Sequence, residues 1–118
     1  MDAYRDAAPA ARHAVDIASD KQGADILLID VHEISSFADY LVILSAGSVR
    51  QIQALANDLT EAVESKGLDL HHREGANESG WVLLDFGDLV VHVFSPEQRD
   101  FYRLEQVWSK GKTLLHIQ

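Results

Sequence analysis

The stretch GWVLLDFGDLVVHVF, residues 80–94, constrains the fold of this chain more than any other. Apolar residues alternate on both sides of Gly87-Asp88, and glycine supplies the positive φ that the first central position of a two-residue hairpin turn needs. The pattern predicts a β-hairpin in which Phe86 faces Leu89. The letters DFG also occur in protein kinases, but 118 residues are too few for a kinase domain, and no Gly-rich or HRD-type loop precedes them.

The predicted hairpin has two different faces. Either a helix covers the mixed face and His92 is a satisfied, half-buried histidine, or Trp81 and its neighbours belong to an interface, where tryptophan is over-represented. Periodicity does not choose between these interpretations, and a one-residue slip would exchange the faces. The mixed face pairs Trp81 with Phe94, Leu83 with His92 and Asp85 with Val90. The other face is wholly apolar and is expected to enter the core: Val82, Leu84, Phe86, Leu89, Val91 and Val93.

Helix and strand patterns also precede and follow the hairpin. Ser48 and Gln51 have the spacing of a capping box, and Ser95 followed by Pro96 is typical of a helix start. The last residues, KTLLHIQ, either fray or add a short strand. The expected helices run over 8–22, from Ser48 to Gly67, and from Pro96 towards Gly111. The other expected strands are 24–31, 38–47 and, at or near a sheet edge, 68–74.

This order of elements predicts an α/β fold, with a mixed β-sheet of four to five strands flanked by helices. Residues 1–118 are expected to form a single small domain, with its core in 10–108 and a tail in 109–118. The last helix is expected to pack on the core through an apolar stripe: Phe101, Leu104, Val107 and Trp108. Tyr102 lies off this stripe, either incidentally or because it shares a surface patch with the hairpin.

Charge and composition narrow the class of function. Lys and Arg total 10 and Asp and Glu total 19, so the formal net charge of −9 argues against a protein that mainly binds nucleic acid. The charge serves solubility, or it steers a basic protein partner. Cysteine is absent, and neither a secretory signal nor an apolar run of the ~20 residues that span a membrane is found. A soluble cytoplasmic protein without a membrane partner is therefore expected.

Enzymatic functions are less well supported by the sequence. SAGSVRQ places Gly47-Ser48 between a strand and a helix, as in nucleotidyltransferases, where backbone N–H groups cradle phosphate. Such enzymes need paired carboxylates on a strand face, whereas Asp85 and Asp88 are separated by a turn. His71 and His72 point to opposite faces of a strand, so no metal site or cofactor is expected. We expect no catalysis, with a nucleotidyltransferase-like enzyme and an adaptor for another protein as alternatives.

Several segments resemble the ribosomal silencing factor family, also called Iojap-like, over about 10–108. Its most specific motifs are W-x-x-x-D-x-G-D-x-x-V-H-V, from Trp81 to Val93, and R-x-x-Y-x-L-E-x-x-W, from Arg99 to Trp108. DILLIDV and SSFADYLVILSAGSVRQIQALANDL add to the likeness. In one departure, HEISSF lacks the glycine that the family often has before the two serines.

The resemblance implies a fold related to nucleotidyltransferases but without catalytic residues. It also implies binding to the large ribosomal subunit through large-subunit protein fourteen, which blocks joining of the small subunit and lowers translation when nutrients are scarce. The partner-binding residues that it implies are Trp81, Phe86, Tyr102 and Leu104. Phe86 conflicts with the predicted hairpin register, which buries it. Whether the chain forms a homodimer is left open.

Overall fold

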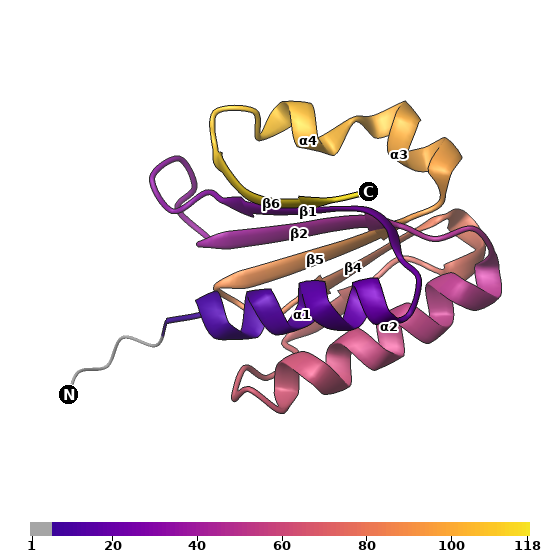
Figure 1. Ribbon diagram of the computed structural model, residues 1–118, viewed down its shortest axis with the longest axis horizontal. Helices are drawn as coiled ribbons and strands as arrows, with labels where there is room; N and C mark the ends of the chain where they lie inside the picture. Colours follow the sequence, from indigo (N-terminus) through magenta and orange to yellow (C-terminus); the bar gives the residue numbers. More distant parts are fainter. Residues whose placement is uncertain (1–5) are drawn as a thin grey trace.

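The computed structural model describes residues 6–118, in which six strands form one mixed sheet (Figure 1). The strand order is β3-β4-β5-β2-β1-β6. The strands are β1 (Ala24–Asp30), β2 (Tyr40–Ser45), β3 (His72–Glu74), β4 (Trp81–Asp85), β5 (Leu89–Phe94) and β6 (Lys112–Ile117). The helices are α1 (Ala8–Asp20), α2 (Val49–Glu64), α3 (Pro96–Tyr102) and α4 (Leu104–Val107), with a single 3-10 turn, η1 (Asn77–Ser79).

The α/β fold is confirmed, but the expected number of strands is too low. Residues 112–117, left open between fraying and a strand, form β6, which pairs antiparallel with β1 at one edge of the sheet. Leu115 lies opposite Leu28 in this pairing. The strand expected over 68–74 is shorter, because only His72–Glu74 pair with β4, at the opposite edge.

The two central strands, β2 and β5, are the only parallel pair in the described sheet. Their connections leave on opposite sides: α2 follows β2 and lies with α1 on one face, while α3 and α4 follow β5 and lie on the other (Figure 1). None of these helices, within the described residues, is long and apolar enough to cross a membrane.

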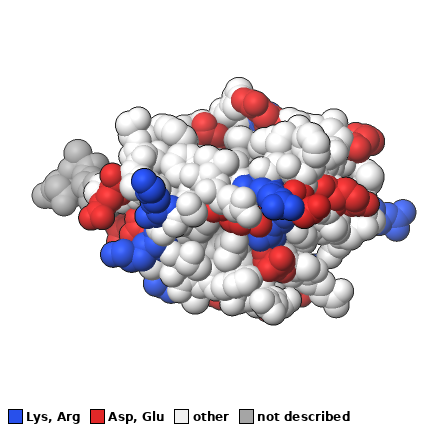
Figure 2. Space-filling view, turned by 90° about the horizontal axis from the view of Figure 1, so that it is seen from above, with Lys and Arg blue, Asp and Glu red and all other residues white. Residues whose placement is uncertain are grey.

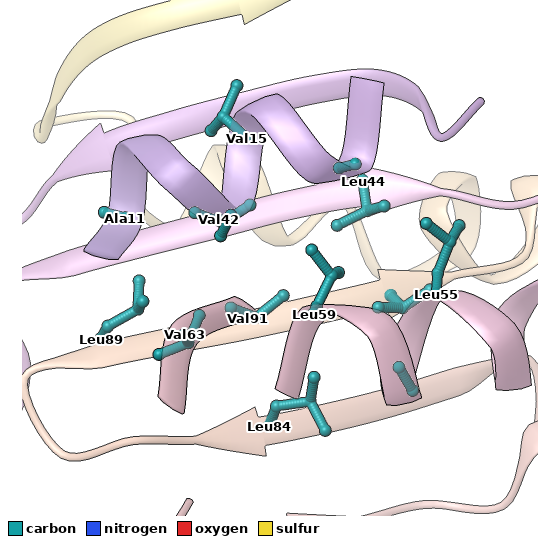
Figure 3. Packing of buried hydrophobic residues seen from close by; sticks show 14 of the residues in the cluster. Ala11, Val15, Val42, Leu44, Leu55, Leu59, Val63, Leu84, Leu89 and Val91 are labelled. Carbon is teal, nitrogen blue, oxygen red and sulfur yellow. The ribbon is translucent and has the colours of Figure 1, made fainter. Parts of the chain in front are cut away.

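The main core lies between the sheet and the layer formed by α1 and α2 (Figure 3). Ser48 caps α2, as predicted, because its side chain accepts a hydrogen bond from the Gln51 N–H at 3.1 Å. Each large apolar side chain buried here stabilises the fold by roughly 1.5–3 kcal/mol. The labelled residues of Figure 3 show how the helices meet the strands: Ala11, Val15, Val42, Leu44, Leu55, Leu59, Val63, Leu84, Leu89 and Val91.

The predicted hairpin and its register are confirmed. Gly87 has a φ of 87°, and the Phe86 N–H donates to the Leu89 carbonyl at 2.9 Å. Trp81 pairs with Phe94, and the other cross-strand partners also match the prediction. The apolar face of the hairpin is buried in the main core, where Phe86 is only 2% exposed.

The prediction of one continuous helix after the hairpin is wrong. Ser95 caps α3 and Pro96 begins it, but the helix ends at Tyr102 because Arg103 adopts a left-handed conformation with a φ of 48°. A second short helix, α4, then starts in a new direction. The expected core stripe is broken as a result: Phe101 and Val107 are 76% and 69% exposed.

Candidate functional site

The outer face of β4 is covered only in part by the helices on its side of the sheet. Its outward residues Trp81, Leu83 and Asp85 are only half-buried, and β3 beside them is exposed along its whole length. Figure 2 looks down on the side where α3 and α4 lie, and it shows acidic and basic side chains in a band across the view with uncharged areas on either side. A partly covered apolar surface bordered by charged residues is a typical site for a protein partner.

Trp81 lies at the centre of a cluster of stacked rings. Its ring centroid is 4.9 Å from that of Phe94, which is fully buried beneath it, and 4.6 Å from that of Tyr102 on α3. Phe101 packs edge-on against Tyr102 at 4.9 Å. Tyr102 itself is 46% exposed. The end of α3 thus extends the hairpin's aromatic face towards solvent.

His92 fixes the indole of Trp81 from below. The Trp81 Nε1–H donates to His92 Nδ1 at 3.1 Å, across the pair of strands that form the hairpin. His92 is 6% exposed, and burial lowers the pKa of its imidazole from 6.5 to about 4. The ring is therefore neutral at pH 7, which lets Nδ1 act as an acceptor. The interpretation of His92 as a buried, hydrogen-bonded histidine is confirmed, except that it is buried more deeply than expected.

Next to the Trp81 cluster lies an apolar hollow of about 290 Å³ between the strands and α4. Phe37, from the loop between β1 and β2, meets Trp108 edge-on at 5.9 Å at one side of it. Leu83 and Glu74 line this hollow and also a second one beside Trp81 and Tyr102, so the two hollows are neighbours over β4. The residues that line the apolar hollow are Phe37, Leu41, His72, Glu74, Leu83, Asp85, Val90, His92, Leu104 and Trp108.

Three of the four site residues predicted from the sequence lie on this side of the sheet. Trp81 and Tyr102 are in contact, and Leu104 packs against the same small core cluster as Trp81. Phe86 lies in the main core on the opposite face, so it is not available for direct contact with a partner. We define the aromatic surface by its accessible members: Trp81, Leu83, Tyr102, Leu104, Trp108 and Phe37.

The sequence interpretation missed Phe37. It placed Trp108 in a core stripe, and Trp108 and Leu104 do pack against the smaller core cluster. Phe37 is 64% exposed and reaches Trp108 from a part of the chain about 70 residues earlier. A signal was present, since HEISSF holds two large apolar residues in a connection that should otherwise be polar. Ile34 is the other of these, and it is 44% exposed.

At the Gly47-Ser48 corner, where a nucleotidyltransferase would hold phosphate, two backbone donors are engaged by the chain's own side chains. The Gly47 N–H donates to Gln51 Oε1 at 2.7 Å, and the Gln51 N–H donates to Ser48 Oγ at 3.1 Å. The Gln51 amide in turn donates to the Gln22 carbonyl at 3.0 Å. Two of the groups that could bind an anion are therefore already hydrogen-bonded within the chain. Within residues 6–118, no group of three or more His, Asp or Glu side chains is arranged to hold a metal ion.

The fold and the site show that the chain is a small α/β protein with a solvent-accessible aromatic surface on one face of its sheet. The family model described as "Ribosomal silencing factor during starvation" matches residues 4–117. The chain belongs to this ribosomal silencing factor family. The match extends past the 10–108 of the motif resemblance and includes β6.

Individual relatives agree with this assignment. The chain is 42% identical over 89 residues to the ribosomal silencing factor RsfS of Bacillus subtilis, which covers 75% of each protein. It is 30% identical over 98 residues to a mouse protein named mitochondrial assembly of ribosomal large subunit protein 1, or 80% of this chain and 43% of that protein. A crystal structure of a Chromobacterium violaceum protein superposes with a TM-score of 0.83 at 32% identity, covering 89% of this chain and 88% of that one.

Proposed function

We propose that this protein binds the large ribosomal subunit through large-subunit protein fourteen and thereby blocks joining of the small subunit in the cytoplasm. The observation that carries this proposal is the Trp81–Tyr102 contact, on a sheet face that α3 and α4 cover only in part, since Trp81 and Leu83 remain half-buried. Tryptophan and tyrosine are the side chains that most often dominate the energy of protein interfaces. The names of the relatives, a silencing factor and a large-subunit assembly protein, support the choice of partner.

Charge supports a basic protein partner at this surface. The chain carries a formal net charge of −9, and Glu74 and Asp85 lie at the hollow beside the aromatic surface. Opposite charges accelerate the encounter of two proteins, and their effect is screened by salt. The association rate with large subunits should therefore fall as the ionic strength rises. An association rate that does not depend on salt would show that the net charge plays no part in docking.

The proposed mechanism is steric and needs no chemistry. Once docked, the bulk of the domain occupies space that the small subunit requires, so translation falls for as long as the complex lasts. The capped Gly47-Ser48 corner supports this mechanism over a nucleotide-dependent one, because two of its backbone donors are already engaged by the Gln51 and Ser48 side chains.

Co-sedimentation with purified large subunits tests the proposal. Wild-type protein should move with large subunits and reduce the peak of joined ribosomes when small subunits are added. Tyr102→Glu should lose both effects, because it places a charge in the aromatic surface. Val49→Glu is the matched control, since Val49 is also 46% exposed but lies at the start of α2, and it should behave like the wild type. Normal binding by Tyr102→Glu would contradict the proposed site, and absence of binding by the wild type would contradict the function.

A further inference from the structure

His92 has a second ring nitrogen that the fold does not use. Because Nδ1 accepts the Trp81 indole N–H and the ring is neutral, the proton of the imidazole resides on Nε2. Among residues 6–118, no hydrogen-bond partner is found for this Nε2–H. The His92 side chain is 6% exposed, and its Nε2 is not among the fully buried atoms that lack a partner, so this donor is within reach of water in the free protein. An acceptor on a bound partner can therefore take the place of that water.

The unused donor belongs to a side chain that lines the apolar hollow. The hollow is lined by Leu83, Leu104 and Trp108 among others, and it adjoins the second hollow beside Trp81 and Tyr102. Apolar walls with one placed hydrogen-bond donor suit a ligand that buries an apolar group and presents a single acceptor.

The acidic side chains at the hollow indicate the charge of its occupant. Glu74 on β3 and Asp85 on β4 both line it, and no Lys or Arg does among the described residues. Glu74 pairs with His72, and Asp85 accepts the Gly87 N–H at 2.8 Å, which leaves carboxylate lone pairs on both residues for a cation. A segment of a basic protein supplies all three features: apolar side chains, Lys or Arg, and main-chain carbonyl oxygens.

We propose that the hollow receives an extended segment of the basic ribosomal partner and that His92 Nε2–H donates a hydrogen bond to a main-chain carbonyl oxygen of that segment. An apolar side chain of the segment enters between Leu83, Leu104 and Trp108, and a Lys or Arg reaches Glu74 or Asp85. The inference rests on the proposed function, because it assigns a specific role within the same surface. His92 then acts twice, holding the Trp81 indole through Nδ1 and the partner through Nε2.

Two substitutions separate these two roles of His92. In His92→Asn, the side-chain amide stands at the position of Nδ1, so it keeps an acceptor for Trp81 but removes the Nε2–H donor. In His92→Gln, the amide reaches the position of Nε2, so it keeps a donor towards the hollow but removes the acceptor for Trp81. If His92 were purely structural, it would need only the Trp81 bond, and His92→Asn should then bind like the wild type.

The experiment measures the dissociation constant of wild-type protein, His92→Asn and His92→Gln for purified large ribosomal subunits, with Val49→Glu as control. Loss of the bond to a partner carbonyl should weaken His92→Asn by about tenfold, with unchanged near-UV circular dichroism from Trp81. His92→Gln should bind more tightly than His92→Asn. Equal binding by His92→Asn and the wild type would overturn the inference while leaving the proposed function intact, whereas absence of wild-type binding would overturn both.

The tautomer of His92 gives an independent test on the free protein. Long-range proton–nitrogen NMR spectra at pH 7 should show a neutral ring with the proton on Nε2. On addition of large-subunit protein fourteen, the Nε2–H resonance should move downfield and become protected from exchange with water. A proton on Nδ1 in the free protein, or an Nε2–H that stays unchanged in the complex, would overturn the inference.

Discussion

Arg99 on α3 and Glu105 on α4 face each other across the break between the two helices, with Arg99 Nε 3.6 Å from Glu105 Oε1. Arg99 is 6% exposed, and its Nη1 also donates to Ser45 Oγ at 3.0 Å and to the Asp25 carbonyl. One guanidinium therefore joins both short helices to the ends of β1 and β2. Since those helices carry Tyr102 and Leu104, Arg99 positions a large part of the aromatic surface.

Replacing Arg99 should cost more stability than replacing its exposed neighbour. Arg99→Met leaves the Glu105 carboxylate and Ser45 without their partner, so the free energy of unfolding in urea should fall by about 2–4 kcal/mol. Arg103→Met is the control, because Arg103 is 60% exposed and its side chain contacts Asp100, through an ion pair at 3.9 Å and a solvent-exposed hydrogen bond to the Asp100 carbonyl at 3.2 Å. It should change stability by about 0.5 kcal/mol or less. Equal losses for the two variants would contradict the anchoring role of Arg99.

Burial of His92 makes the stability of the fold depend on pH in a defined window. The pKa of His92 falls from 6.5 to about 4 on folding, so the unfolded chain binds more protons between these values. The stabilising contribution is fully present above pH 6.5 and is lost as the pH falls towards 4, by at most about 3 kcal/mol.

The free energy of unfolding of wild type and His92→Asn, measured in urea from pH 7 to pH 4, isolates this contribution. The difference between the two proteins should shrink as the pH falls, because asparagine does not titrate. His32, whose pKa is raised chiefly by its hydrogen bond to Asp39, has the opposite effect on stability, present at low pH and lost as the pH rises through its folded pKa. The wild type and His92→Asn share the effect of His32, so it cancels in the difference between their free energies of unfolding. A constant difference over this range would show that His92 is not held neutral.

Gly75 should be essential for the loop that leads into Trp81. It has a φ of 91°, and a Cβ at this position would lie 2.1 Å from the Trp81 carbonyl oxygen. Gly75→Ala should therefore destabilise the protein by about 2 kcal/mol or more, or displace Trp81 and change its fluorescence. Gly47→Ala is the control, because its Cβ would meet only Gln51 Oε1 at 3.6 Å. If calorimetric melting temperatures fell equally for both variants, the close approach at Gly75 would not matter.

The parts of the fold that could be predicted from the sequence are those whose signals are local. Gly87 fixes the turn and, with it, the register of the whole hairpin, so the sequence alone assigns Trp81 and Phe86 to opposite faces. Ser48 and Ser95 likewise mark helix starts through hydrogen bonds to residues three positions later.

The parts that could not be predicted depend on contacts between distant segments. No Gly or Pro marks the break at Arg103, whose left-handed conformation accompanies the ion pair between Arg99 and Glu105. β6 becomes a strand because it pairs with β1, about 90 residues earlier in the chain. For the same reason, no periodicity within one segment could have placed Phe37 against Trp108 at the hollow.

The proposed function depends above all on docking of the aromatic surface to large-subunit protein fourteen. Calorimetric titration of the purified chain with isolated large-subunit protein fourteen measures this docking without the rest of the ribosome, with folding of each variant checked by circular dichroism. We expect binding by the wild type and by Val49→Glu, and a loss of about 30-fold or more for Trp81→Glu, as at an interface hot spot. Wild-type affinity in folded Trp81→Glu would show that the aromatic surface is not where the partner docks.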